Sequence, residues 1–155
     1  MRIAPALIAG TGVSLVLYGV CLYSDALTLS TRGLNMTEIL TGYAVLEIGA
    51  VAILYGQFAW LANVALCASW AYALANKHAP VLYTSAFALL LSLHTLRFNQ
   101  SQITDKSGSC CLQIDTLHIG FYLWLASISA MVAASFVAKH SGNRPNPSIN
   151  PDAAR

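Results

Sequence analysis

Cysteine and histidine are the residue types in this chain that could support redox or metal chemistry. The four cysteines are Cys21, Cys67, Cys110 and Cys111, and no Cys-x-x-Cys pair occurs among them. A thiol oxidoreductase needs a redox pair of that kind, so its absence argues against this function. Adjacent cysteines bond to each other only in a strained ring, so the more natural pairing joins Cys110 or Cys111 to Cys21. These three cysteines are therefore candidates for a structural disulfide.

Two histidines, His94 and His118, are the candidates for cofactor binding. Each is expected about one helical turn from the outer end of its helix, so both side chains could lie at one depth. Two histidines on facing helices can bind a b-type haem. Interfacial histidines also commonly make one hydrogen bond and bind nothing, and we favour that plainer role. No third ligand fixes a metal site, although Asp115 is close in sequence to His118. The sequence thus predicts no cofactor, with haem b as the alternative.

Glu47 is the acidic residue that lies inside an apolar segment. A carboxylate in hydrocarbon is costly unless it meets water, a partner or a proton. Proton and ion pathways usually use several buried ionisable groups, and the chain has no inverted repeats. Transport by a single copy is therefore not indicated, and we expect Glu47 to lie near the outer headgroups.

The composition indicates the environment in which these residues act. Hydrophobic residues make up 57% of the 155 residues and charged residues only 9%, against about 25% charged in a soluble domain. This balance predicts an integral membrane protein, and the length allows three to five spans without a separate catalytic domain. The net charge of +2 is small and the basic residues are scattered, which argues against nucleic-acid binding. The expected partner of the chain is the lipid bilayer, and a non-enzymatic role is favoured.

Four apolar segments are long enough to cross a bilayer, which takes about 20 helical residues. They predict an all-α membrane four-helix bundle over residues 1–140, followed by a disordered cytoplasmic tail at 141–155, which is rich in Pro, Asn and Ser. Polar loops are expected at 25–37 and 99–115. The expected spans are at about residues 3–23, 56–75, 80–98 and 116–138.

The apolar stretch from 38 to 75 is too long for one crossing, since about 25 residues is the upper range. Asn35 and Glu38 have the residue types of a helix start, so an extra helix is expected at about 36–54. We expect it to be interfacial or re-entrant, and to join the second span through a bend near Gly56. If it crossed the membrane instead, the chain would have five spans, and the basic residues do not exclude that alternative.

Three glycines mark one face of this extra helix. Gly42, Gly49 and Gly56 recur every seven residues, which returns nearly to the same side of a helix. Such a ridge permits close packing, either inside the bundle, which is the plainer explanation, or against another protein. Asn63 shares a stripe with Gly56 and Trp60 and should face protein, because an amide in hydrocarbon needs a hydrogen-bond partner. The expected interaction residues are Gly42, Glu47, Gly49, Gly56, Trp60 and Asn63.

Two other spans carry recognisable faces. The first span has a weakly polar stripe that we expect to turn from lipid towards partner helices, and its members are Thr11, Ser14, Tyr18 and Cys21. The third span has a face of small residues, which are Ser85, Ala88, Ser92 and Thr95. Its other face carries larger residues, which are Tyr83, Phe87, Leu90, His94 and Arg97. Two usable faces indicate an interior position for this helix.

The basic residues predict the orientation of the chain. With four spans and the N-terminus inside, more basic residues lie on the cytoplasmic side than outside, in agreement with the positive-inside bias. The cytoplasmic set is Arg2, Lys77, Lys139, Arg144 and Arg155. The outer set is Arg32, Arg97 and Lys106. Both termini are therefore expected in the cytoplasm.

Two short runs add a resemblance. Residues 56–63 read Gly-Gln-Phe-Ala-Trp-Leu-Ala-Asn, preceded by Gly42 and Gly49, and residues 121–127 read Phe-Tyr-Leu-Trp-Leu-Ala-Ser. These runs resemble an uncharacterised family of small bacterial four-span membrane proteins with a motif of this type. Many of its members have proline after the asparagine, where this chain has Val64, so the local helix geometry is expected to differ. The resemblance implies a bacterial inner membrane and brings no catalytic residues.

Together these features predict a non-enzymatic, multi-pass protein of a bacterial inner membrane that acts by helix-to-helix contact. Its partner would be another membrane protein or a second copy of the chain. It would serve as an accessory subunit of a membrane complex, or as a protector of the toxin-immunity type. The alternative is a haem-binding or quinone-linked electron-transfer protein.

Overall fold

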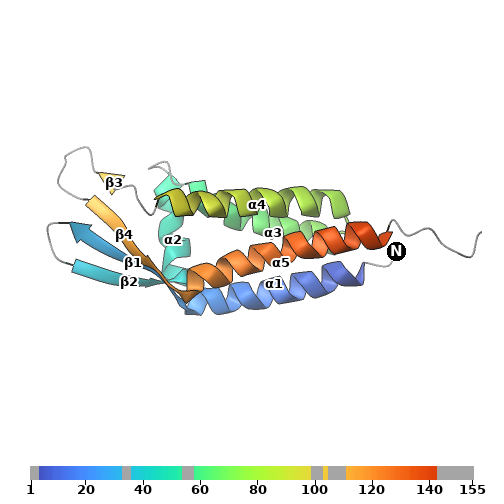
Figure 1. The fold of residues 1–155 in the computed structure, drawn as a ribbon, viewed down its shortest axis with the longest axis horizontal. Coiled ribbons are helices and arrows are strands. Elements are labelled where there is room, and N and C mark those ends of the chain that lie inside the picture. The colour runs from blue at the N-terminus through green and yellow to red at the C-terminus, as the bar shows by residue number, and fades with distance from the viewer. Residues whose placement is uncertain (1–3, 33–35, 54–57, 99–102, 105–110, 143–155) are drawn as a thin grey trace, which may run out of the picture.

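The structure is mostly helical, with a small β-sheet at one end. The computed structural model describes residues 4–32, 36–53, 58–98, 103–104 and 111–142. Four long helices lie side by side, and a short helix stands across their ends beside the sheet (Figure 1). The long helices, which we call the helical body, are α1 (Pro5–Tyr23), α3 (Leu61–Leu74), α4 (His78–Phe98) and α5 (Ile119–Gly142). The short helix is α2 (Gly42–Ala52), and a 3-10 helix, η2 (Phe58–Trp60), leads into α3.

The structure places a long helix on each of the four segments predicted as spans. Among the described residues, two helices have the length and apolar composition to cross a membrane, and these are Pro5–Tyr23 and Ile119–His140. Phe58–Leu74 is a shorter apolar helix. The positions of the helices therefore agree with the prediction, and α1 and α5 are the two that qualify as membrane-crossing by length and composition.

The all-α prediction is wrong, because the two expected polar loops contain β-strands. The strands form one antiparallel sheet in the order β2-β1-β4-β3. Their bounds are β1 (Asp25–Arg32), β2 (Met36–Thr41), β3 (Ile103–Thr104) and β4 (Cys111–Leu117). The sheet thus joins the segment after α1 to the segment before α5, and it sits at the end of the helical body next to α2 (Figure 1).

The alternation of apolar and polar side chains along β1 explains why this segment forms a strand with one apolar face. Successive residues of a strand point to opposite faces, so Leu27 and Leu29 share one face while Thr28 and Ser30 share the other. Leu29 pairs with Ile114 across the β1–β4 ladder. One face of the sheet is therefore apolar and turned towards the protein, as in other antiparallel sheets with one covered side.

The start of α2 also differs from the prediction. Residues 36–41 pair with β1 as strand β2, so the expected cap at Asn35 and helix start near Met36 are wrong. The helix begins at Gly42, and its N-cap is Thr41, whose Oγ1 accepts a hydrogen bond from the Ala44 amide at 3.4 Å. The extra helix before the second long helix nevertheless exists. The expected bend near Gly56 lies outside the described residues.

The polar stripe of α1 packs against other helices, as predicted. Thr11, Ser14 and Cys21 are buried, and Tyr18 is half-buried. The Ser14 and Ser127 hydroxyls lie 3.0 Å apart between α1 and α5, and the Trp70 indole of α3 donates to Ser14 Oγ at 3.0 Å. The stripe therefore connects three helices of the body.

The predicted interior position of α4 is wrong. Its small-residue face is buried, since Ser85, Ala88 and Ser92 are each 0% exposed. Its large face is open, because Tyr83 and Leu90 are among the most exposed apolar residues. The helix therefore packs on one side only, and the large residues form an outer surface.

Candidate functional site: an apolar cavity beneath α2

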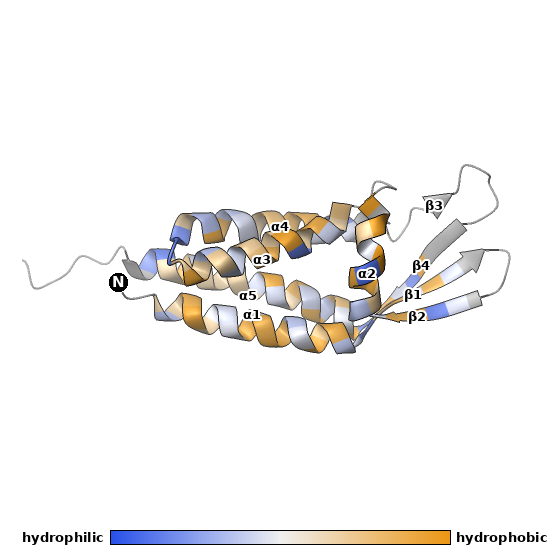
Figure 2. Ribbon diagram, turned by 180° about the vertical axis from the view of Figure 1, so that it is seen from behind, coloured by the Kyte–Doolittle hydropathy of each residue, from blue (hydrophilic) through white to orange (hydrophobic). Residues whose placement is uncertain are grey.

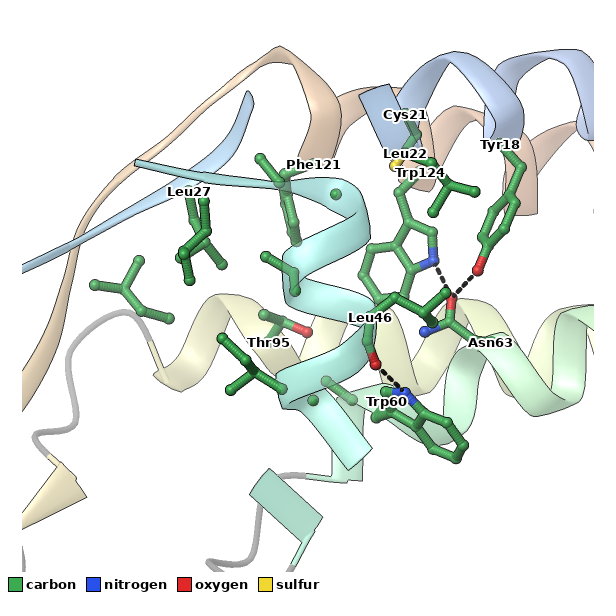
Figure 3. Close-up of a pocket in the computed structure, with 18 of the residues that line it drawn as sticks. Tyr18, Cys21, Leu22, Leu27, Leu46, Trp60, Asn63, Thr95, Phe121 and Trp124 are labelled. Atoms are coloured by element: carbon green, nitrogen blue, oxygen red, sulfur yellow. Dashed lines mark hydrogen bonds between the residues drawn. The ribbon is translucent and has the colours of Figure 1, made fainter. Parts of the chain in front are cut away.

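A cavity of about 230 Å³ lies where α2, the apolar face of the sheet and the ends of the long helices meet (Figure 3). The sheet contributes Leu27, Leu29, Leu40 and Ile114 to its wall. Every element of the helical body contributes as well, and the residues from it include Tyr18, Cys21, Asn63, Thr95, Phe121 and Trp124. The cavity is thus assembled from segments far apart in the sequence.

Gly42 fixes the first end of α2 over the cavity. Its amide donates to the Ser24 carbonyl at 2.9 Å, just beyond the end of α1. A Cβ at this position would collide with the Cys21 carbonyl oxygen and would meet Leu22 Cα at 3.1 Å. Only glycine permits this approach of two backbones.

Trp60 holds the part of α2 around Leu46 and Gly49 in place. Its indole Nε1 donates to the Leu46 carbonyl at 2.8 Å, and a Cβ on Gly49 would lie 2.7 Å from Trp60 Cδ1. Gly42 and Gly49, two members of the predicted glycine ridge, therefore pack against other parts of the same chain. This agrees with the plainer of the two explanations of the ridge, which was packing inside the bundle. The third, Gly56, lies outside the described residues.

Glu47 lies on the exposed side of α2. Its carboxylate accepts a hydrogen bond from Tyr43, one turn earlier, and this bond together with the negative charge raises the pKa of Tyr43. The residue is therefore on a different side of α2 from Gly42 and Gly49, as expected, and it does not reach the cavity.

Asn63 is the polar centre of the site, and the prediction that it faces protein is confirmed. Its Oδ1 accepts from the Trp124 indole Nε1 at 2.8 Å and from the Tyr18 hydroxyl at 3.2 Å. Figure 3 shows both aromatic side chains converging on this one oxygen. Because an indole nitrogen can only donate, the oxygen of the Asn63 amide must be the atom that faces Trp124.

This orientation leaves the Asn63 Nδ2 group with two hydrogens to donate. Within the described parts of the chain, no residue accepts a hydrogen bond from it. Thr95 provides a second polar group in the wall, since its buried Oγ1 has no hydrogen-bond partner among the described residues. Thr95 belongs to the predicted small face of its helix, but a threonine in an apolar helix carries no pattern that marks it as a site residue.

The two histidines do not come together at this site. His118 Nε2 lies 2.7 Å from Thr28 Oγ1 and 3.2 Å from Thr116 Oγ1, at the junction of the sheet and α5. Neither His94 nor His118 lines the cavity. The part of the chain that the structure describes holds no group of three or more His, Cys, Asp or Glu side chains arranged for a metal ion. The haem alternative stays a prediction.

The predicted disulfide from Cys21 to Cys111 is not formed. Cys21 is a free, buried thiol at the end of α1. Cys111 pairs with Arg32 at the far end of β4, whereas Leu117 at the near end pairs with Leu27. Six residues of strand at about 3.3 Å each separate the two ends by roughly 20 Å, which is too far for a disulfide. Cys110 lies outside the described residues.

The chain matches no protein-family model, no curated protein and no solved structure. The resemblance to small four-span bacterial membrane proteins therefore stays a prediction. The site combines apolar walls with one oriented amide donor and one buried hydroxyl.

Proposed function

We propose that this chain is a multi-pass protein of a bacterial inner membrane, in which α1, η2 with α3, α4 and α5 form a bundle of four spans. It acts by contact with another membrane protein or a second copy, and not as an enzyme. The observation that carries the proposal is the distribution of polarity in the helical body, in which serines are buried beside an apolar core and large apolar side chains also cover the outer surface.

The buried side of this pattern consists of serines. Each is 1% exposed or less, and they are Ser14, Ser69, Ser85, Ser92, Ser127 and Ser135. Their hydroxyls bond to helix carbonyls or to one another, for example Ser135 to the Met131 carbonyl at 2.7 Å. Small residues at contacts between helices and hydroxyls that bond locally are typical of membrane bundles.

The exposed side consists of large apolar residues on every long helix. Examples are Val16 at 66%, Leu74 at 70%, Tyr83 at 73% and Leu90 at 67% exposed. Apolar colours run along the helical body, and hydrophilic colours gather on β2 and at the turn between α3 and α4 (Figure 2). A water-soluble monomer rarely exposes so much contiguous apolar surface, whereas lipid covers it without cost.

The charges at the two ends support an orientation. The start of α1, the α3–α4 turn and the end of α5 lie at the end away from the sheet (Figure 1). That end carries Lys77 and Lys139, and the sheet end carries Arg32 of β1 and Arg97 of α4. The orientation therefore rests on the basic residues of the whole sequence, of which more are expected on the cytoplasmic side than outside, and it puts both termini in the cytoplasm and the sheet outside.

Exposed apolar residues at the sheet end support a contact function. Tyr23 is 90%, Ile39 60% and Ile119 61% exposed, and all three lie where the helices meet the sheet. Ile39 is on β2, which is an edge strand of the described sheet and can pair with another chain. A protein partner at this level would cover these residues, either as the rest of a membrane complex or as a toxin that the chain blocks.

The membrane topology is tested by extraction and labelling. The chain should stay in the membrane pellet at alkaline pH. In a version whose native cysteines are replaced by alanine, a cysteine at Asp115 should react with an impermeant maleimide in spheroplasts, and one at Lys139 only after permeabilisation. Release into the alkaline supernatant, or equal labelling of both positions, would overturn the topology.

The contact function is tested by photo-crosslinking in cells. A benzophenone amino acid at Ile39 should give protein adducts of discrete mass, whereas the same group at Val16, on the proposed lipid face of α1, should not. Adducts to a second copy would identify a homo-oligomer, and adducts to another protein would identify a complex or a toxin. Absence of protein adducts at Ile39, Tyr23 and Ile119 alike would refute contact at this end.

A further inference from the structure

We propose that the cavity beneath α2 binds one uncharged apolar molecule that carries a carbonyl oxygen, and that the Asn63 amide donates a hydrogen bond to that oxygen. This inference goes beyond the contact function proposed above and does not depend on it. It is carried by the volume of the cavity, the composition of its walls and the fixed orientation of Asn63.

The volume sets the size of the molecule. An apolar cavity of roughly 150 Å³ is enough to bind benzene. The cavity here is about 230 Å³, so it has room for a substituted six-membered ring or for a comparable length of acyl chain. A molecule of this size would lie between α2 and the aromatic side chains of α5, Phe121 and Trp124.

The walls exclude charged molecules. Among the described residues that line the cavity, none is Asp, Glu, Lys or Arg, and most are aliphatic or aromatic. An ion placed there would lose its hydration with nothing to replace it. An uncharged apolar molecule would instead gain from leaving water.

Asn63 determines which polar group the bound molecule must carry. Its Oδ1 is already used by Trp124 and Tyr18, so the group that remains is a donor and not an acceptor. A carbonyl oxygen is the ordinary acceptor for such an amide. A group that can only donate, such as an indole N–H, would leave Nδ2 without a partner.

Thr95 distinguishes two kinds of molecule that carry a carbonyl oxygen, a quinone and a lipid acyl ester. Its hydroxyl enters the wall from α4, whereas Asn63 enters it from α3, so the two donors reach the cavity from different helices (Figure 3). A quinone ring, with two carbonyl oxygens on opposite sides, can use both donors. The ester carbonyl of a lipid acyl chain can use only one.

Binding can be measured with the tryptophans of the full-length chain in detergent. Trp60 and Trp124 line the cavity, whereas Trp70 does not. Two probes separate the sources: tetramethyl-1,4-benzoquinone, and a phosphatidylcholine with brominated acyl chains. Each should quench tryptophan fluorescence with a saturable component if it enters the cavity, over the linear background of collisions in the micelle.

The variants assign the saturable component to the site. Asn63→Asp keeps an oxygen that accepts from Trp124 and Tyr18 and removes the amide N–H donors, so at a pH at which the carboxyl is ionised it should weaken binding roughly tenfold or more. Thr95→Val should weaken the quinone and leave the lipid unchanged. Ser92→Ala is the matched control on α4, because that hydroxyl bonds to the Leu89 carbonyl and does not line the cavity.

A second variant covers the case in which Asn63→Asp does not fold. Val45→Phe places a larger side chain in the cavity from α2 and leaves Asn63 intact, so it should abolish saturable quenching. Saturable quenching by either probe that falls in Asn63→Asp or Val45→Phe supports the proposal. Only linear quenching with both probes, or saturable quenching that is the same in every variant, overturns it.

Discussion

The indole nitrogen of Trp124 donates a hydrogen bond to the side-chain oxygen of Asn63 at 2.8 Å, and this bond joins α5 to α3. The Tyr18 hydroxyl joins the same oxygen from α1, at 3.2 Å. One amide oxygen therefore ties together three helices of the body next to the cavity. In an apolar environment such a shared acceptor is difficult to replace, because each donor would lose the one acceptor that it has among the described residues.

Replacement of Asn63 by leucine should therefore destabilise the fold. The indole and the phenol would both lose their acceptor, and a buried donor left unpaired costs about 1–3 kcal/mol. Thermal unfolding in detergent, followed by circular dichroism, measures this loss. Asn63→Gln is the control that keeps an amide oxygen, on a side chain one methylene longer, so it should lose less than Asn63→Leu. Equal loss in both variants would show that the oxygen does not hold the helices together.

A haem between His94 and His118 can be tested directly. The Nε2 atom of His118 lies 2.7 Å from the Thr28 hydroxyl, so an iron ligated by that nitrogen would displace this hydrogen bond. Protein purified from haem-replete cells should therefore show no Soret band. A Soret band that disappears in His94→Ala or His118→Ala would instead restore the electron-transfer alternative.

The helices could be predicted because their signal is local. A run such as 119–140 is long and apolar enough to be recognised without knowledge of its neighbours. The sheet could not be predicted in the same way, since Leu29 pairs with Ile114, far along the chain. Alternation in Asp25–Arg32 was the available signal, but a short strand among polar residues looks like a loop until its partner is known.

The site was predictable only in part, because it too is formed by residues that are far apart in the sequence. Asn63 could be expected to face protein, because an amide is costly in lipid wherever it lies. Its partners could not be named, since Tyr18 and Trp124 come from the first and last helices. The glycine spacing likewise predicted that another part of the protein packs closely against Gly49. It could not predict that this neighbour is Trp60, because that depends on how α2 turns across the ends of the long helices.

The pair of Tyr43 and Glu47 gives a prediction about pH. Glu47 raises the pKa of Tyr43, because the protonated phenol donates to the carboxylate and ionisation would bring two negative charges together. The folded-state pKa is then higher than the unfolded one, so any stabilisation is present below the unfolded pKa and is lost as pH rises through the folded pKa.

The tyrosinate difference spectrum between the protein and its Tyr43→Phe variant isolates this titration. Glu47→Gln should move it to lower pH. Glu38→Gln is the control, since that exposed carboxylate belongs to β2 and is not a cause of the Tyr43 shift. An identical titration of Tyr43 with glutamate or glutamine at position 47 would show that the two side chains do not interact.

The glycines of α2 and α1 provide a matched set for the last prediction. A Cβ on Gly42 would collide with the Cys21 backbone, a Cβ on Gly49 would lie 2.7 Å from the Trp60 ring, and a Cβ on Gly12 would meet nothing within 4 Å. Backbone yields less readily than a side chain, so Gly42→Ala should destabilise more than Gly49→Ala. Gly12→Ala should be neutral or stabilising by up to about 1 kcal/mol, since alanine is the better helix former.

Leucine at Gly49 extends this test from stability to function. It should push Trp60 away from α2, break the 2.8 Å bond from its indole to the Leu46 carbonyl, and lower the yield of folded monomer in mild detergent. Size-exclusion chromatography and thermal unfolding measure both effects, with Gly12→Leu as the control of equal size on a helix surface. An intact Gly49→Leu monomer that no longer co-purifies with its partner would place this face of α2 on an interface between proteins, and an intact, fully interacting one would leave Gly49 without a packing role.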